Sequence, residues 1–212
     1  MEPRQVRTAA DARTIVDERG VNHVKVGAFD IDGIMRGKYI SRDKFLSSLD
    51  GGFGFCDVVL GWDCQDQLYD NVKYTGWHTG YPDAPVRLLP DTCRLLPFED
   101  NGLFFLGEFS PPAETVWPRG LLRRVLERGR AMGFEAYVGF EYEFFVFKET
   151  PESVREKNYR GLTPMAPGWF GYSVIRNSTG NAFYRQLLDH CRDMDMAIEG
   201  LHEETGPGVM EA

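Results

Sequence analysis

The 212-residue chain is acidic, with a formal net charge of -8, and 42% of its residues are hydrophobic. That apolar content can bury a sizeable core and excludes wholesale disorder, while the acidic balance argues against nucleic acid or an anionic membrane as the main partner. No apolar run is long enough to cross a bilayer, the N-terminus lacks an apolar secretory segment, and the four cysteines are widely spaced without a CxxC pair. We therefore expect a cytoplasmic protein with reduced thiols.

The first part of the chain predicts a helix, a hairpin and a second helix, in that order. Residues 5–19 have a helix-forming composition, and Gly20 is placed to stop that helix. Residues 21–40 alternate like two strands around the turn sequence "DIDG", which is a hairpin signal. A short helix is expected over residues 42–49.

A change in composition near residue 112 indicates two domains. Residues 61–97 are rich in Asp, Gly, Pro and aromatic residues with little periodicity, and residues 101–109 predict a strand. The proline-rich segment "SPPAETVWPRG" follows directly. We expect one domain over residues 1–112 and a second over residues 113–212.

The second half predicts an α+β layer with antiparallel pairing. Its expected elements are a helix at 121–133, a strand at 140–147, a helix at 181–195, a strand at 196–204, a turn at 205–208 and a strand at 209–212.

The segment "FEYEFFVF" at residues 140–147 places two glutamates in an apolar run. In a strand, Glu141 and Glu143 would project from the same face. Their aromatic neighbours predict burial, and buried like charges require a proton, a cation or a salt-bridge partner.

Two further glutamates flank the last predicted turn. Glu203 and Glu211 would face each other across this hairpin and converge with Glu141 and Glu143 if the strands are neighbours in one sheet. A cluster of carboxylates suits hard cations such as Mg²⁺ or Mn²⁺. The alternative is a solvated strand face and ordinary surface glutamates beside a turn.

These motifs resemble the glutamine synthetase family. The resemblance rests on "GFEYEFFVF" after the helix "PRGLLRRVLERGRAMGF" and on "AIEGLHEETGPGVMEA" at the end of the chain. In the first half, "VKVGAFDIDGIMRGKYI" is similar to the opening hairpin of the family's N-terminal β-grasp domain, and "YPDAPVRLLPDTCRLLPF" to its segment with a Pro-Asp signature. The resemblance implies an α+β chain in which a β-grasp domain is followed by the first, truncated part of the catalytic α/β barrel.

The family's metal ligands map onto four positions of this sequence. Glu143, Glu203 and Glu211 match the glutamates that hold the first metal, and Glu141 matches a ligand of the second. The resemblance implies Mg²⁺ or Mn²⁺ as cofactor and ATP as co-substrate, with a γ-glutamyl phosphate formed before an amine attacks it.

The segment "GWDCQDQLYD" lies where the family keeps an aspartate that removes a proton from ammonium. Asp63 is the preferred match and Asp66 the second, and the alternative is that either one caps a turn. Val209 stands where the family usually has Gln. The form of the segment "GWDCQDQLYDN" resembles the divergent branch that includes γ-glutamylpolyamine and other γ-glutamylamide ligases.

The resemblance implies glutamate, ATP and ammonia or an amine as substrates of a full-length parent, and a homo-oligomeric ring, a dodecamer. Because the family's remaining ligands lie beyond residue 212, we expect this chain alone to be an inactive fragment. Two other readings stay open. One is a non-catalytic structural or assembly member of the family; the other is a carboxylate-pair hydrolase, in which the two carboxyls lie about 5 Å apart.

Overall fold

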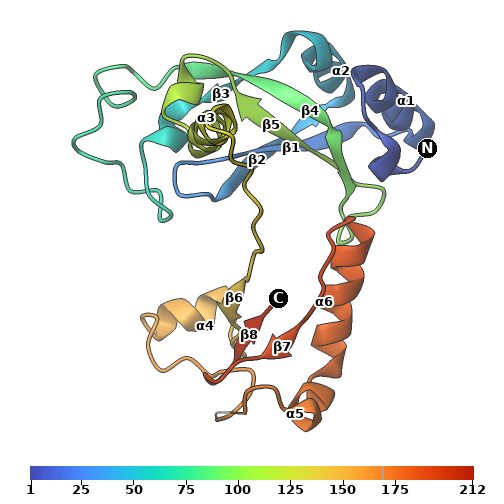
Figure 1. Cartoon of the computed structure of the whole chain (residues 1–212), viewed down its shortest axis with the longest axis vertical. Coiled ribbons are helices and arrows are strands. Elements are labelled where there is room, and N and C mark those ends of the chain that lie inside the picture. The colour runs from blue at the N-terminus through green and yellow to red at the C-terminus, as the bar shows by residue number, and fades with distance from the viewer. Residues whose placement is uncertain (169) are drawn as a thin grey trace. The chain divides into compact units, whose positions relative to one another are not determined.

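The computed structural model describes residues 1–168 and 170–212. It divides into two compact units, Met1–Ala136 and Tyr137–Ala212 (Figure 1). The first unit includes the helix that follows the proline-rich segment, so the division between the compact units lies after residue 136 and not at residue 112. The domain boundary at residue 112 remains a prediction. No helix among the described residues combines the length and apolar character needed to cross a bilayer.

The first unit contains a five-stranded mixed sheet with the order β2-β1-β5-β4-β3. β1 runs antiparallel to β2 and parallel to β5, and β4 runs antiparallel to β5 and β3. Its elements are η1 (Pro3–Gln5), α1 (Ala9–Arg19), β1 (His23–Phe29), β2 (Met35–Ser41), α2 (Arg42–Gly51), β3 (Phe53–Cys56), η2 (Asp57–Leu60), β4 (Asp83–Leu95), β5 (Leu103–Phe109), η3 (Ala113–Thr115) and α3 (Pro118–Ala131).

The first helix and its stop signal are confirmed. Thr8 is the N-cap of α1, where its side chain accepts a hydrogen bond from the Asp11 backbone N–H in a capping box. Gly20 ends the helix in the left-handed conformation with φ +60°, which a glycine adopts without a steric cost. The buried side of α1 then packs on the sheet through Ile15 and Val16.

The predicted hairpin is also confirmed, and a buried carboxylate organises its turn. Asp30 is fully buried, and its Oδ1 accepts hydrogen bonds from the backbone N–H groups of Asp32 and Ile34. Its Oδ2 accepts a 2.8 Å hydrogen bond from Nε of Arg36 on β2. The Asp30 charge is therefore compensated inside the hairpin.

Strand β4 was not predicted, because residues 61–97 show little periodicity. The structure places a long strand at Asp83–Leu95, which alternates between buried and exposed side chains over its first half. Pro85 and Pro90 interrupt the sequence pattern, and the register with β5 shifts between Leu89 and Arg94. Prolines are rare inside central strands, so the sequence signal was weak although the buried positions Ala84, Val86 and Leu88 alternate.

Helix α3, predicted at 121–133, is confirmed, and charged groups hold its first turns. Glu108 on β5 is almost buried and forms ion pairs with Arg119 and Arg123 at 3.0 and 2.9 Å and with Arg87. The fully buried Trp117 precedes the helix and donates from Nε1 to the carbonyl of Phe29 at 2.6 Å. These contacts orient α3 against the sheet.

The second unit contains a three-stranded sheet with the order β6-β8-β7. Its elements are β6 (Glu143–Phe145), α4 (Pro151–Glu156), α5 (Val174–Thr179), α6 (Asn181–Asp193), β7 (His202–Glu203) and β8 (Val209–Glu211). The helix predicted at 181–195 is confirmed as α6, but the strands predicted at 140–147 and 196–204 are much shorter than expected. The mixed α and β composition agrees with the predicted α+β class.

The turn predicted at residues 205–208 is confirmed. The backbone N–H of Glu204 donates to the carbonyl of Val209, and Gly208 has φ +74°. A Cβ atom at Gly208 would lie 2.7 Å from the carbonyl oxygen of Val146, so both the conformation and the space require glycine there.

Candidate functional site

The sheet of the second unit brings Glu143 and Glu211 together. They are direct partners across β6 and β8, and His202 pairs with Glu211 from β7 on the other side. Residues that are opposite one another in neighbouring strands point to the same face. Glu143, Glu211 and His202 therefore form one row across the sheet.

Glu204 follows β7 and joins this row at His202. Its Oε1 lies 2.9 Å from Nε2 of His202, and Oε2 of Glu211 lies 3.8 Å from the same nitrogen. One ligand atom from each of these three residues lies within 4.8 Å of the other two. The three side chains are partly buried.

Tyr172 covers the imidazole of His202. The two rings are stacked with their centroids 4.4 Å apart. A hydrogen bond to Glu204 raises the pKa of the Tyr172 hydroxyl, and the charges of Glu211 and Glu141 add to that shift. The pKa of Glu204 is lowered, first by its hydrogen bond with His202 and then by the one with Tyr172. His202 and Tyr172 therefore stabilise the charged form of Glu204.

Glu203 lies on the opposite side of the sheet. It pairs with Met210, one residue away from the row that contains Glu211, and successive residues in a strand point to opposite faces. Its carboxylate is buried, and its Oε1 lies 3.1 Å from the hydroxyl of Tyr184 on α6. Burial, followed by this hydrogen bond to Glu203, raises the pKa of Tyr184. The structure thus brings Glu143 and Glu211 together and places Glu203 apart from them.

The expected burial of the strand glutamates is wrong for the described chain. Glu141 and Glu143 are both exposed, and so are Phe140, Tyr142 and Phe145. Strand β6 is three residues long and lies at the edge of a three-stranded sheet, so too few neighbours surround these side chains to bury them.

The donor set fits a divalent cation in part. Glu143 and Glu211 offer carboxylate oxygens on one face, which suits Mg²⁺ or Mn²⁺. Glu203 points to the opposite face, where it contacts Tyr184, and Glu141 precedes β6. The assignment of all four glutamates as ligands stays a prediction.

Asp63 and Asp66 lie in the first unit, and both carboxylates have local partners. Oδ1 of Asp63 accepts hydrogen bonds from the backbone N–H groups of Gln65 and Gln67 at 2.8 and 2.9 Å, which closes a turn. Asp66 has φ +62° and forms a 2.7 Å ion pair with Nη1 of Arg36. Both carboxylates stabilise the conformation of this loop. A proton-transfer role for Asp63 remains a prediction.

His202 and Glu204 were not among the predicted site residues. The sequence signal was the run "HEE" directly before the turn, in which alternate residues share a face. Only the pairing of His202 with Glu211 shows that this face is the one that carries the acidic row.

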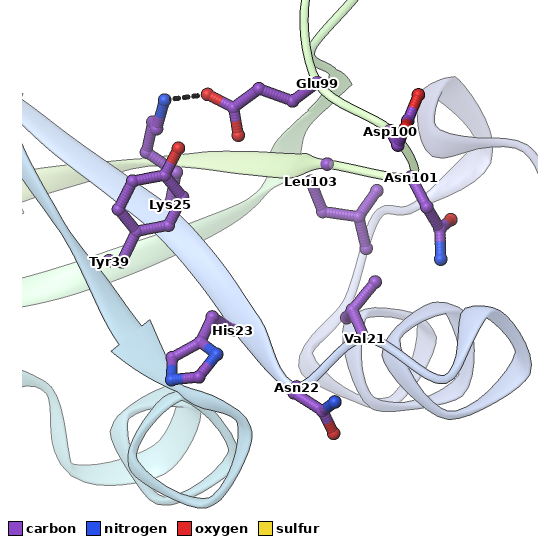
Figure 2. A pocket seen from close by; sticks show the side chains of 10 residues that line it. Val21, Asn22, His23, Lys25, Tyr39, Glu99, Asp100, Asn101 and Leu103 are labelled. Atoms are coloured by element: carbon purple, nitrogen blue, oxygen red, sulfur yellow. Dashed lines mark hydrogen bonds and ion pairs between the residues drawn. The ribbon is translucent and has the colours of Figure 1, made fainter.

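A shallow polar hollow in the first unit holds none of the predicted site residues. It has a volume of about 240 Å³ and lies between β1 and the loop before β5 (Figure 2). Lys25 and Glu99 form an ion pair in its wall, which raises the pKa of Lys25 and lowers that of Glu99. The ammonium of Lys25 also lies 4.5 Å from the centre of the Tyr39 ring. The charges of Lys25 and Glu99 therefore compensate each other.

Comparisons with known proteins point to one family. Residues 115–212 match the family model described as glutamine synthetase, catalytic domain. The chain is 43% identical to type-1 glutamine synthetase 2 of Dictyostelium discoideum, over 89% of this chain and 37% of that protein. It is 29% identical to a glutamate–isopropylamine ligase of Pseudomonas sp., over 94% of this chain and 44% of that protein.

A solved structure shares the fold of this chain. The solved structure of apo GmaS matches with a TM-score of 0.69 and 17% identity, over 94% of this chain and 43% of that chain. The chain thus spans well under half the length of these relatives.

Proposed function

The chain belongs to the glutamine synthetase family, and we propose that it is part of an ATP-dependent ligase that joins the γ-carboxyl group of glutamate to ammonia or an amine through γ-glutamyl phosphate. The observation that carries this proposal is the cross-strand pair Glu143 and Glu211, which offers two carboxylates on one face of the sheet within the segment that matches the catalytic domain.

Glu143, Glu203 and Glu211 would hold the first divalent cation, Mg²⁺ or Mn²⁺, and Glu141 the second. When bound, such cations screen phosphate charge and assist phosphoryl transfer. Glu143 and Glu211 are already neighbours on one face, whereas Glu203 lies on the opposite face against Tyr184 and would join them only if the pairing of β7 with β8 changed. We further propose that residues 1–112 form a β-grasp domain and residues 113–212 the first part of a catalytic barrel.

Asp63 is proposed to take a proton from ammonium or from a protonated amine, so that the neutral amine can attack the γ-glutamyl phosphate. Its carboxylate is held in the loop by two backbone hydrogen bonds, and a positioned carboxylate can act as a general base. The acceptor itself is proposed to be ammonia or a small amine, because the similar proteins are named as a glutamine synthetase, a glutamate–isopropylamine ligase and a γ-glutamylethanolamide synthetase. We further propose that the full-length protein is cytoplasmic and forms a ring-shaped homo-oligomer, a dodecamer.

The ligase proposal is tested with a chimera. This chain replaces the matching part of the Dictyostelium relative, and amine-dependent ADP release is measured with glutamate, ATP, Mg²⁺ and either ammonia, isopropylamine or ethanolamine. We expect ligation that is lost in Glu143→Gln and Glu211→Gln and kept in Glu156→Gln, an exposed glutamate of α4. A folded chimera that binds Mn²⁺ but releases no ADP would favour a non-catalytic member of the family.

The chain by itself is expected to show no sustained turnover. In the described residues no lysine or arginine forms an ion pair with Glu143, Glu203 or Glu211, whereas phosphoryl transfer requires basic groups around the phosphate. The purified chain is assayed for amine-dependent phosphate release under the same conditions. Sustained release that disappears in Glu143→Ala would contradict this expectation.

A further inference from the structure

The three residues His202, Glu204 and Glu211 form a compact donor set with mixed chemistry. Their ligand atoms lie within 4.8 Å of one another, and the ligand atoms of a single tetrahedral cation lie about 3.5 Å apart. One donor is an imidazole nitrogen and two are carboxylates. This set differs from the four glutamates of the proposed function, with which it shares only Glu211.

The carboxylates of this set have hydrogen-bond partners but few cationic ones: Glu204 lies 2.9 Å from His202 and accepts a 3.1 Å hydrogen bond from the backbone N–H of Thr205. Within residues 1–168 and 170–212, no lysine or arginine forms an ion pair with Glu204 or Glu211, and His202 is their one basic neighbour. Glu143 lies directly across from Glu211 on the same face. Like charges at such short range repel one another, and a bound cation would relieve that repulsion.

We propose that His202, Glu204 and Glu211 bind a borderline divalent cation such as Zn²⁺ or Co²⁺ in preference to Mg²⁺. Imidazole is a good ligand for Zn²⁺ and Co²⁺, while Mg²⁺ prefers oxygen ligands and keeps most of its water. Three protein ligands with one open position are also the usual number at a zinc site that is not purely structural.

Neighbouring groups hold two of the donors in place. The Tyr172 ring is stacked on His202, which fixes the plane of the imidazole, and the Tyr172 hydroxyl bonds to Glu204. Nε2 is the ring nitrogen that faces both carboxylates, so it is the nitrogen that would ligate. Outer contacts of this kind typically orient metal ligands and strengthen binding.

The shared residue links this site to the proposed function. The carboxylate of Glu211 cannot be a full ligand of two cations at once. Zn²⁺ bound at His202 would therefore compete with Mg²⁺ or Mn²⁺ bound at Glu143. This consequence rests on the proposed function, but binding of Zn²⁺ to the chain does not. A measurement of Zn²⁺ binding to the chain therefore tests the proposed site even if the proposed ligase function is wrong.

The test is a titration of the purified full chain with Zn²⁺ by calorimetry and with Co²⁺ by visible absorption, in a large excess of Mg²⁺. We expect one cation per chain, a Co²⁺ absorption band of a four-coordinate site, and retention in Mg²⁺. Tyr172→Phe keeps the stacked ring but loses the hydroxyl, and should weaken Zn²⁺ binding roughly tenfold. His202→Gln should weaken it more than Tyr172→Phe.

Controls separate this site from chance binding. His78→Gln removes an exposed histidine of the first unit and should leave Zn²⁺ affinity unchanged. If His202→Gln does not fold, the histidine C–H signals of the wild-type chain provide a second measurement, because Co²⁺ should shift the His202 signal first. Zn²⁺ affinity that is unchanged in both His202→Gln and Glu204→Gln, or complete displacement by Mg²⁺, would overturn the proposal.

Discussion

The most buried glutamate of each unit, Glu108 in the first and Glu203 in the second, has a different kind of partner. In the first unit, Glu108 is surrounded by Arg87, Arg119 and Arg123, and Asp30 is paired with Arg36. In the second unit, Glu203 is equally buried, but its partner is the neutral hydroxyl of Tyr184. A charge that is compensated by the chain stabilises a fold, whereas a charge that is left without a counter-ion is typical of a ligand site.

The units also differ in how they bury aromatic side chains. Phe105, Phe109 and Trp117 are fully buried in the core of the first unit, and the rings of Phe109 and Trp117 meet edge to face. Phe140 and Tyr142 in the second unit are stacked on each other but exposed. The same residue types therefore contribute to stability in one unit and form an exposed apolar surface in the other.

The largest expected effect compares two aromatic deletions. Trp117→Ala removes a fully buried ring and its hydrogen bond to Phe29, and should lower the free energy of unfolding by about 4 kcal/mol. Phe140→Ala removes a ring that is 74% exposed and should change it by less than about 0.5 kcal/mol. Urea unfolding followed by fluorescence and circular dichroism measures both, and equal losses would break the comparison.

A second pair of variants compares the two buried glutamates. Glu108→Gln leaves three arginines without their carboxylate; because these arginines are partly exposed, we expect a loss of about 2 kcal/mol. Glu203→Gln removes a buried charge that has no cationic partner, so without metal it should be neutral or stabilise the chain by about 1 kcal/mol.

These two variants are compared by urea unfolding in EDTA, with Glu156→Gln as the exposed control. If Glu203→Gln destabilises the chain as much as Glu108→Gln, then Tyr184 alone compensates the charge of Glu203, and the argument that Glu203 awaits a cation loses its basis.

A third prediction concerns pH and the second unit. Hydrogen bonds from Lys157, Ser153 and the backbone of Thr163 lower the pKa of Glu149 from 4.5 to about 2. A lowered pKa stabilises the folded state above the unfolded value of 4.5, and this contribution is lost as the pH falls through about 2. Glu149→Gln should therefore be less stable than the wild type at pH 6, and the difference should disappear near pH 2. A difference that does not change with pH would exclude an ionic role for Glu149.

The smallest expected effect concerns Asp63. Asp63→Ala loses the acceptor for the N–H groups of Gln65 and Gln67 and should cost about 1 kcal/mol, while Asp63→Asn keeps an acceptor oxygen and should cost less. In the active chimera, Asp63→Asn should still lower amine-dependent turnover, because an amide cannot take a proton. Full activity in Asp63→Asn would exclude a proton-transfer role and leave Asp63 only the structural role of closing its turn.

The sequence predicted the local elements where propensity and capping agree. The capped helix α1, the hairpin around Asp30, and helices α3 and α6 all follow from short-range signals such as Thr8, Gly20 and the turn "DIDG". The family resemblance was also present in the sequence, because it rests on short motifs with fixed spacing. Strand β4 was missed because Pro85 and Pro90 conceal its alternation.

The sequence by itself determined which carboxylates are present and that Glu203 and Glu211 flank a turn. Only the tertiary structure decided which of them meet, because strand register selects the face: Glu143 and His202 both pair with Glu211, while Glu203 pairs with Met210 and turns toward Tyr184. The burial of a side chain likewise depends on which strands and helices pack around it. The aromatic segment at residues 140–147, whose composition predicts a buried strand, therefore lies exposed because β6 is at the edge of its sheet.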